Sequence, residues 1–378
     1  MMKKDWEIKR LGDYCKIRTG KLDANAACEN GRYPFFTCSV TPLKINSYSF
    51  DCECVLVAGN GDLNVKYYEG KFDAYQRTYI IESVDKTILD VHYLYSFLSS
   101  YIDELRKQSI GAIIKYIKLG NLTEAPIPVP PLEEQKRIVK ILDEKFAQLE
   151  SLKAASQTNL QNAKDLFQSQ LTKVFSNTTW EKKRLGDCGT FKNGMNFAAT
   201  DSGYTIRSLG VGDFKDRYSI DDTETLSEIS LKAAPSEDYL LHDGDIVFVR
   251  SNGNKELVGR CVLVYPKDIP TTYSGFCIRF RKDFDLLDAD FLLHFMKAES
   301  SRKILNGKEG ANISNLNQKI LGDFEVPLPP LPEQKRIVKE LDTLSEKVRL
   351  LQEIYTKQIA NCDELKQAYL QKAFEGEL

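Results

Sequence analysis

The sequence has few histidines, and its cysteines lack the close spacing of a zinc site. Only three histidines occur, at positions 92, 242 and 294, and no two of the nine cysteines form a Cys-x-x-Cys pair. Protein zinc sites are usually built from such closely spaced pairs. We therefore expect no bound metal, and we expect the scattered cysteines to be the reduced thiols of an intracellular protein.

Long apolar runs are also lacking. No stretch approaches the roughly 18 apolar residues of a membrane-spanning helix, and the basic start Met1-Met2-Lys3-Lys4 is not followed by the apolar segment of a signal peptide. The sequence thus predicts no membrane contact and a cytoplasmic location. The net charge is only −2, from 52 basic and 54 acidic residues. This balance argues against polyanion binding by the whole surface but leaves room for a local basic face.

Motifs of nucleotide-dependent enzymes are missing as well. Gly20-Lys21 and Gly307-Lys308 lack the upstream glycine of a Walker A loop, and the Asn/Asp-Pro-Pro-aromatic tetrapeptide of amino methyltransferases does not occur. Two Glu-Gln-Lys segments, beginning at Glu134 and Glu333, mimic the end of a nuclease motif. Each stands where a helix is expected to begin, and acidic residues there favour the helix dipole. We predict that the chain is not itself an enzyme and has no catalytic residues.

The sequence does contain a long internal repeat. Residues 6–13 return at 180–187 with seven of eight identical, residues 128–143 return at 327–342 with thirteen of sixteen identical, and 171–175 return at 370–374. The interiors of the two copies align poorly. The 378 residues leave room for two or three domains. A repeat that keeps its ends and changes its interior suits one scaffold that presents two different binding surfaces.

The interiors have the pattern of a mixed α/β fold. Helices are predicted behind Asp90 and Asp288, each a candidate N-cap followed by apolar residues at helical spacing. Short β-rich runs are bounded by Gly, Asn, Asp or Pro: residues 54–58, 77–81, 245–249, 261–265 and 276–280.

A proline-rich stretch followed by a long helix ends each copy. Neither helix contains an internal Gly or Pro, and at about 40 residues each would be roughly 60 Å long. Apolar residues recur every three or four positions, which predicts that the helices pack on each other as an antiparallel coiled coil within one chain. Two independent dimerisation helices are the alternative. The predicted seam consists of Ile138, Leu142, Leu149, Leu152, Ile337, Leu341, Leu344, Val348, Leu351, Tyr355 and Leu365.

Polar and basic residues gather in the segments that differ between the copies. Arg, Asn and Gln can bond to base edges, and Lys and Ser can hold phosphates. Any one of these residues could equally belong to a solvated loop, but their parallel placement in both copies favours a DNA-binding role. In the first copy the candidates are Lys16, Arg18, Thr19, Lys21, Asn60, Asn64, Lys66, Tyr68, Gln76, Arg77 and Lys115. In the second copy they are Lys192, Asn193, Asn196, Arg207, Arg250, Ser251, Asn252, Asn254, Lys255, Tyr273, Asn312, Ser314 and Asn315.

The repeated motifs carry a resemblance to a known family. Pro-x-Pro-Pro-Leu-x-Glu-Gln-Lys-Arg-Ile-Val occurs twice before a long helix, Trp-Glu-x-x-Arg-Leu-Gly-Asp opens both copies, and Gly-Asp-Ile-Val-Phe-Val-Arg-Ser stands at 244–251. In these motifs the chain resembles the specificity subunit of Type I restriction-modification systems. The resemblance implies two α/β (α+β) target recognition domains related by a pseudo-twofold repeat and separated by two long helices. The boundaries predicted are 1–132 and 179–331 for the recognition domains, with helices at 133–178 and 332–378.

The resemblance also implies partners. Each recognition domain would read half of a split site in double-stranded DNA. Two modification subunits would methylate adenine at N6 with S-adenosylmethionine, and restriction subunits would cleave DNA with ATP and Mg, so this chain would bind no cofactor. We predict that the repeated motif docks the modification subunits through Glu134, Gln135, Lys136, Arg137, Glu333, Gln334, Lys335 and Arg336. Helix capping is the plainer reading of these residues. Alternatives for the chain as a whole are a coiled-coil scaffold unconnected with restriction and a self-contained methyltransferase or nuclease.

Overall fold

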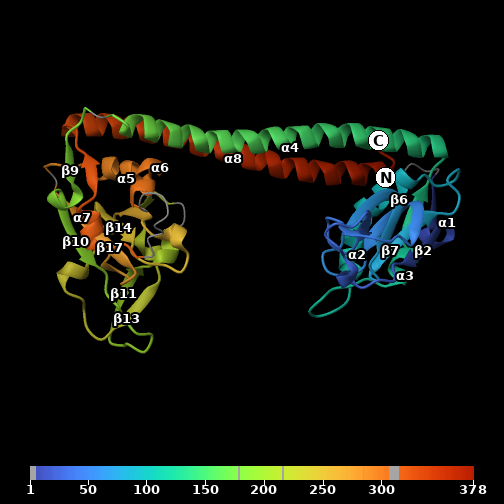
Figure 1. Ribbon diagram of the computed structural model, residues 1–378, viewed down its shortest axis with the longest axis horizontal. Helices are drawn as coiled ribbons and strands as arrows, with labels where there is room; N and C mark the ends of the chain where they lie inside the picture. Colours follow the sequence, from blue (N-terminus) through green and yellow to red (C-terminus); the bar gives the residue numbers. More distant parts are fainter. Residues whose placement is uncertain (1–5, 178, 215–216, 284, 306–314) are drawn as a thin grey trace. The chain divides into compact units, whose positions relative to one another are not determined.

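A computed structural model of the protein describes residues 6–177, 179–214, 217–283, 285–305 and 315–378 (Figure 1). The chain forms two compact units. Unit 1 comprises Met1–Thr158 and Tyr355–Leu378, and unit 2 comprises Asn159–Ile354. The two longest helices, α4 (Leu132–Phe175) and α8 (Leu331–Glu375), each contribute residues to both units. Among the described residues, no helix is both long and apolar enough to cross a bilayer.

Unit 1 is built on a six-stranded sheet with the strand order β2-β7-β5-β6-β3-β4. Strands β1 and β8 form a separate antiparallel pair, and Ile127 of β8 lies in the same apolar core as Ile138 of α4 and Leu370 of α8. The elements before α4 are β1 (Glu7–Arg10), α1 (Leu11–Tyr14), β2 (Cys15–Thr19), β3 (Tyr33–Phe36), β4 (Leu43–Ile45), β5 (Phe50–Ala58), β6 (Val65–Ala74), β7 (Thr78–Ser83), α2 (Val91–Gln108), α3 (Leu119–Thr123) and β8 (Pro126–Val129).

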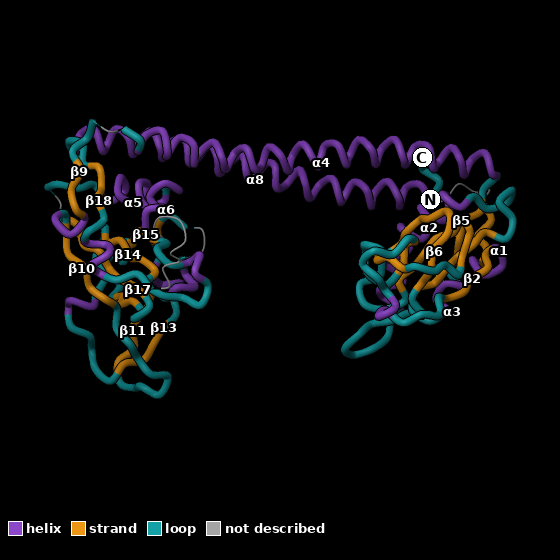
Figure 2. Tube along the Cα trace, in the orientation of Figure 1, coloured by secondary structure: helices purple, strands orange, loops and turns teal. Residues whose placement is uncertain are grey.

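Unit 2 contains a five-stranded sheet, β10-β17-β14-β15-β12, and a three-stranded sheet, β13-β11-β16. The β9–β18 pair corresponds to β1–β8 in unit 1. The elements are β9 (Lys182–Arg184), β10 (Gly189–Asn193), β11 (Tyr204–Leu209), β12 (Ser219–Ile220), β13 (Glu228–Leu231), β14 (Asp245–Val249), β15 (Cys261–Val264), β16 (Thr271–Tyr273), β17 (Cys277–Lys282), α5 (Ala289–Lys297), α6 (Glu299–Leu305), α7 (Gln318–Gly322) and β18 (Glu325–Pro327). The sheets and helices of both units, coloured by type in Figure 2, confirm the mixed α/β prediction.

The central strand of each unit is buried on both faces. Successive side chains of a strand point to opposite sides, so Val55 and Val57 of β5 pack with α2 while Cys54 and Leu56 join a second, smaller core. In β14 the residues Ile246 and Phe248 pack with α5, and Val247 and Val249 face the other core. This double burial explains why these strands are continuous apolar runs in the sequence.

The divergent interiors share one strand topology. In unit 1, β3 pairs antiparallel with β4 and parallel with the end of β6; in unit 2, β11 pairs antiparallel with β13 and parallel with β16. Both units also need a glycine at the same close approach. A Cβ on Gly20 would lie 1.9 Å from the Ala74 carbonyl oxygen, and a Cβ on Gly194 would lie 2.1 Å from that of Ser274. The repeat therefore extends through regions where the sequences do not align.

Within each unit, segments of α4 and α8 pack together. In unit 1 they run antiparallel, because Lys153 contacts Asp363 at 2.6 Å while the earlier Glu150 contacts the later Lys366 at 3.3 Å. In unit 2, Phe167 of α4 joins the same apolar core as Val348 of α8. This confirms the predicted helix pairing as far as each unit extends.

The predicted seam is partly wrong. Leu152, Leu351 and Leu365 are exposed, whereas Ser156 and Cys362 are buried. The buried and half-buried positions of α8 follow a seven-residue repeat: 348 and 362 are buried, and 352, 355, 359 and 366 are half-buried. The leucines at 351 and 365 stand one residue away, on the edge of the contact. The pattern of apolar residues therefore predicted part of the seam one residue away from the positions that form the contact. Ile138, Leu142, Ile337, Leu341 and Val348 are buried as predicted, and Leu149, Leu344 and Tyr355 are half-buried.

The ends of the long helices explain the third repeated motif. In unit 2, the ring of Phe175 at the end of α4 lies 5.4 Å from Phe291 and 5.3 Å from Phe295 of α5. In unit 1, the ring of Phe374 near the end of α8 lies 5.2 Å from Tyr93 of α2. In each unit, the last turns of one long helix thus pack against the first helix that follows the sheet: α4 against α5 in unit 2, and α8 against α2 in unit 1.

Candidate nucleic-acid interface

In unit 1, three separate segments meet beside the end of β5. The Gly59 amide donates to the Arg77 carbonyl at 2.7 Å, and the Ile117 amide donates to the Gly59 carbonyl at 2.9 Å. Asn60 forms a bridge with Tyr116. These backbone bonds bring together three of the loops predicted to bind DNA, those of Asn60, Arg77 and Lys115.

Unit 2 repeats this arrangement. The Arg250 amide donates to the Phe276 carbonyl, and the Leu316 amide donates to the Arg250 carbonyl, both at 2.8 Å. Ser251 forms a bridge with Asn315. Arg250, Ser251, Phe276 and Asn315 therefore occupy the places of Gly59, Asn60, Arg77 and Tyr116. We call these four pairs of positions the loop frame: the backbone bonds are alike in both units, and the side chains differ at every pair.

Several unit 1 candidates have partners inside the protein. Arg18 forms an ion pair with Glu82 at 2.6 Å, and Gln76 donates to Asp23 at 2.5 Å. The Asn64 amide donates to the Cys38 carbonyl at 2.8 Å and its oxygen accepts from Lys66, whose pKa is lowered by burial. These contacts shape the loops.

The other unit 1 candidates differ in exposure and place. Tyr68 packs against aromatic rings in the middle of β6, and Lys16 lies toward the opposite end of β2 from Thr19. Asn60 is half-buried in the loop frame. Of these other candidates, Thr19, Lys21, Arg77 and Lys115 have exposed side chains at or near this end of the sheet.

In unit 2, Tyr273 is a core residue and not a surface candidate. Its ring is fully buried and its hydroxyl donates to the Lys192 carbonyl at 3.3 Å. The predicted contact of Tyr273 with DNA is therefore wrong: its place in the strand β16 turns the side chain into the core. Lys192 forms an ion pair with Asp238 at 3.1 Å, and Arg207 donates to the Leu226 carbonyl at 2.9 Å.

The loop between β14 and β15 carries the largest group of unit 2 candidates. The Asn252 side chain accepts from the Asn254 amide at 2.8 Å, and Asn254 accepts from the Glu256 amide at 3.0 Å. These two bonds shape the loop locally, as Asn side chains often do in turns. Asn254, Lys255, Asn196 and Asn315 are exposed, and Asn193, Arg250, Ser251 and Asn252 are half-buried. Asn312 and Ser314 lie outside the described residues.

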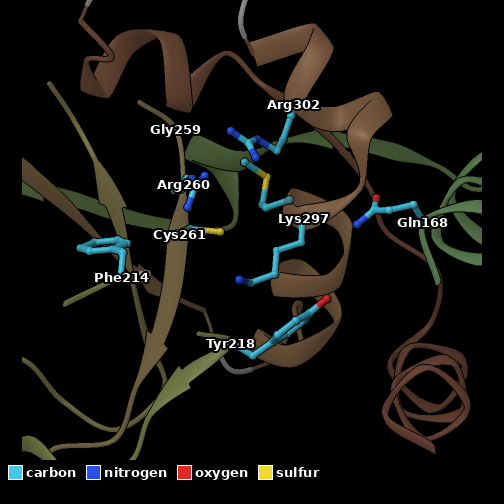
Figure 3. A pocket seen from close by; sticks show the side chains of 9 residues that line it. Gln168, Phe214, Tyr218, Gly259, Arg260, Cys261, Lys297 and Arg302 are labelled. Atoms are coloured by element: carbon cyan, nitrogen blue, oxygen red, sulfur yellow. The ribbon is translucent and has the colours of Figure 1, made fainter. Parts of the chain in front are cut away.

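A small pocket lies beside Gly259 and Arg260, at the end of this loop (Figure 3). The lining of this cavity of about 210 Å³ includes three cationic residues: Arg260 just before β15, Lys297 at the end of α5 and Arg302 in α6. Lys297 donates to the Arg217 carbonyl at 2.7 Å, and its ammonium lies 4.2 Å from the Tyr218 ring centroid. Arg302 donates to the Glu256 carbonyl at 2.9 Å. Since Glu256 belongs to the β14–β15 loop, Arg302 anchors that loop to α6.

Sequence reasoning missed Phe276. Its side chain is 60% exposed although it belongs to the loop frame. The apolar run 276–280 predicted a strand beginning at this residue, whereas β17 begins at Cys277. The Ser274-Gly275 pair before it was the available turn signal.

The repeated Glu-Gln-Lys-Arg motif divides into a buried and an exposed part. Gln135 and Gln334 are completely buried, so their predicted role in docking a partner is wrong. Lys136, Arg137, Lys335 and Arg336 are exposed and Glu134 and Glu333 half-buried at the start of α4 and α8. Arg137 pairs with Glu134 and Arg336 with Glu333, at 2.7 and 2.8 Å. The Arg336 ion pair lowers the pKa of the Glu333 carboxyl.

The described residues contain no group of three or more His, Cys, Asp or Glu side chains arranged to hold a metal ion. What the geometry offers instead is two sets of loops with polar and cationic side chains on matching frames. Such a surface can contact phosphates and base edges without performing a reaction.

Comparison with known proteins identifies the family. The chain matches the family described as "Type I restriction modification DNA specificity domain" at residues 3–161 and again at 177–358. It is 31% identical to the Type I restriction enzyme EcoDI specificity subunit of Escherichia coli over 99% of this chain and 89% of that protein. It is 30% identical to the StySPI specificity subunit of Salmonella potsdam, over 74% of this chain and 63% of that protein.

Solved structures share the fold. A chain from a study of complex assembly and conformational transition of the type I R-M system matches with a TM-score of 0.78, at 19% identity and full coverage of both chains. The HsdS subunit from Thermoanaerobacter tengcongensis matches with a TM-score of 0.61 at 19% identity, over 100% of this chain and 98% of that one. With two domain matches that cover most of the sequence and a full-length relative above 30% identity, this chain belongs to the family of Type I restriction-modification specificity subunits.

Proposed function

We propose that this chain selects the DNA sequence for a Type I restriction-modification complex and performs no chemistry itself. The observation that carries the proposal is the loop frame, which occurs twice and presents Asn60, Arg77 and Tyr116 in unit 1 but Ser251, Phe276 and Asn315 in unit 2. Equivalent frames with different side chains suit the reading of two different half-sites. Because its target is cellular and incoming DNA, we place the protein in the cytoplasm.

The relatives are named as subunits of Type I restriction enzymes. From this we infer that modification subunits, which supply S-adenosylmethionine and the methyltransferase site, bind this chain, and that restriction subunits join with ATP and Mg. The motif at 134–137 and 333–336 presents an exposed Lys-Arg pair in each copy, which supports two modification subunits per chain. The recognition domains would span 1–132 and 179–331, joined and followed by helical segments 133–178 and 332–378.

We also propose that the long helices set the gap between the half-sites. α4 has 44 residues and α8 has 45. At 1.5 Å per residue each corresponds to about 66 Å, close to two turns of B-DNA at about 34 Å per turn. The addition of one heptad to both helices is expected to lengthen the gap and leave both half-sites unchanged.

Methylome sequencing tests the proposed function. The chain is co-expressed with the modification subunits of its own system in a host without other adenine methylation, and a matched strain lacks this chain. We expect one N6-methyladenine motif made of two half-sites, present only when the chain is present. Methylation of the same motif in both strains, or no methylation in either strain with an assembled complex, contradicts the proposal.

A further inference from the structure

The turn that carries Phe276 is held by backbone bonds on all sides. The Ser274 amide donates to the Leu209 carbonyl at 2.9 Å, and the Gly275 amide donates to the Met195 carbonyl at 2.8 Å. The Cys277 amide closes the turn on the Ser274 carbonyl at 2.8 Å. A Cβ on Gly275 would lie 2.0 Å from the Asn196 side-chain oxygen, but this exposed side chain can move away, so it is the backbone bonds that hold the turn. The backbone under Phe276 is therefore rigid.

Unit 1 has the same turn, with the same backbone hydrogen bonds. The amides of Tyr75, Gln76 and Thr78 donate to the carbonyls of Phe36, Leu22 and Tyr75 at 2.9, 2.9 and 2.8 Å. The residue at the place of Phe276 is Arg77, and both carbonyls accept from the residue that follows the central strand, Gly59 or Arg250. One rigid position thus presents a guanidinium in unit 1 and a phenyl ring in unit 2.

The phenyl ring of Phe276 stands in polar surroundings. Its carbonyl accepts from the amides of Arg250 and Ser251 at 2.8 and 3.4 Å, and the Arg250 side chain donates to the Gly275 carbonyl at 3.4 Å. Asn252 and Lys255 follow in the same loop. A 60% exposed ring is unfavourable in water, and the Arg250 guanidinium on the same turn suits a DNA duplex better than an apolar protein surface.

The side chains of Arg77 and Phe276 can recognise different groups on a base pair. Arginine at this position can donate two hydrogen bonds to guanine in the major groove. A phenyl ring has no donor or acceptor, and the apolar group that a base pair presents in the major groove is the C5 methyl of thymine. We propose that Phe276 is a specificity-determining residue of unit 2 that packs on a thymine methyl group in its half-site; this inference rests on the proposed DNA-reading function.

The test removes only the methyl group. The probe is a duplex that carries the motif found by methylome sequencing, with each thymine of the half-sites replaced in turn by deoxyuridine. Binding is measured by competition with the complex of this chain and its modification subunits. At one thymine, the loss of the methyl is expected to weaken binding about fourfold, which corresponds to about 0.8 kcal/mol. The variant Phe276→Ala should bind the thymine and deoxyuridine duplexes equally, and Phe276→Leu should retain part of the difference.

Two controls separate this inference from the proposed function. Arg250→Ala should weaken binding of all duplexes and keep the methyl effect. If the wild-type complex loses no affinity at any deoxyuridine, or if Phe276→Ala keeps the full difference, the inference is wrong while the function stands. A uniform loss with Phe276→Ala that does not depend on any methyl, as expected of a ring wedged between base steps, also overturns it. If the wild-type complex does not prefer its motif over an unrelated duplex, the proposed function fails together with the inference.

Discussion

The Gln135 side chain holds the backbone of Asp90, the residue that caps helix α2. Gln135 Oε1 accepts from the Asp90 amide at 2.9 Å, and its Nε2 donates to the carbonyls of Ile88 and Pro130 at 2.7 and 2.8 Å. In unit 2, Gln334 accepts from the Asp288 amide at 2.8 Å and donates to Leu286 and Pro329. The repeated glutamine therefore joins the start of each long helix to the cap of the helix that follows the sheet.

This contact predicts that Gln135→Ala and Gln334→Ala destabilise the fold. Each change removes three hydrogen bonds and leaves the buried carbonyl of Pro130 or Pro329 without this partner, so we expect a loss of roughly 2 kcal/mol or more in the free energy of unfolding. Urea denaturation of the full chain is the measurement, with the exposed neighbours Lys136→Ala and Lys335→Ala as controls. Unchanged stability with a loss of partner binding would instead support the docking role that burial excludes.

A second prediction concerns the helix seam. Val348→Asp places an unpaired charge in the apolar core of unit 2 and should cost roughly 3 kcal/mol or more. Leu351→Asp, at a side chain that is 36% exposed, should cost about 1 kcal/mol or less. Thermal melting of both variants measures the difference. Equal losses would mean that Leu351 and not its neighbour lies in the seam.

A third prediction concerns Arg302, a positioning residue. Arg302→Met keeps the apolar stem but removes the hydrogen bond to the Glu256 carbonyl, so the β14–β15 loop should loosen. We expect methylation to become less selective at the same half-site that Arg250→Ala affects, with little change in melting temperature. The neighbouring Lys303→Met, which loses only an exposed ion pair with Glu299, is the control. An unchanged motif with Arg302→Met would show that the loop does not depend on this anchor.

The exposed part of the repeated motif leads to a fourth prediction. Charge reversal at Lys136 and Arg137 should remove one modification subunit per chain, and the same reversal at Lys335 and Arg336 should remove the other, because like surfaces bind like partners. Mass measurement of the purified complex gives the stoichiometry, and Lys347→Glu/Lys357→Glu on exposed positions of α8 is the matched control. Two subunits still bound after both reversals would place docking elsewhere.

Local signals allowed much of this fold to be predicted. The caps at Asp90 and Asp288 are confirmed, since both side chains accept from an amide three residues on. The run at 245–249 is strand β14 with the predicted bounds. These predictions succeeded because an N-cap needs a particular residue type and because a strand buried on both faces is a continuous apolar run.

The parts that could not be predicted depend on backbone contacts between distant segments. Carbonyl and amide groups form the loop frame whatever the side chain, so Gly59 and Arg250, or Arg77 and Phe276, show no likeness in the sequence. The burial of Tyr273 and of Gln135 likewise follows from where neighbouring elements place them. A polar or aromatic residue type alone does not show whether the side chain lies at the surface, where it can contact DNA, or in the core.

We propose that each unit reads its own half-site. The most direct test is methylome sequencing of two variants in the assembled complex, one with Ala at Arg250, Asn252 and Lys255, the other with Ala at Asn60, Arg77 and Lys115. We expect the first variant to relax or lose one half of the motif and the second to relax or lose the other half, with base-reading contacts worth about 1–3 kcal/mol each. If both variants affect the same half, if either abolishes both halves while the complex stays intact, or if the motif is unchanged, the two units do not each read a half-site through these loops.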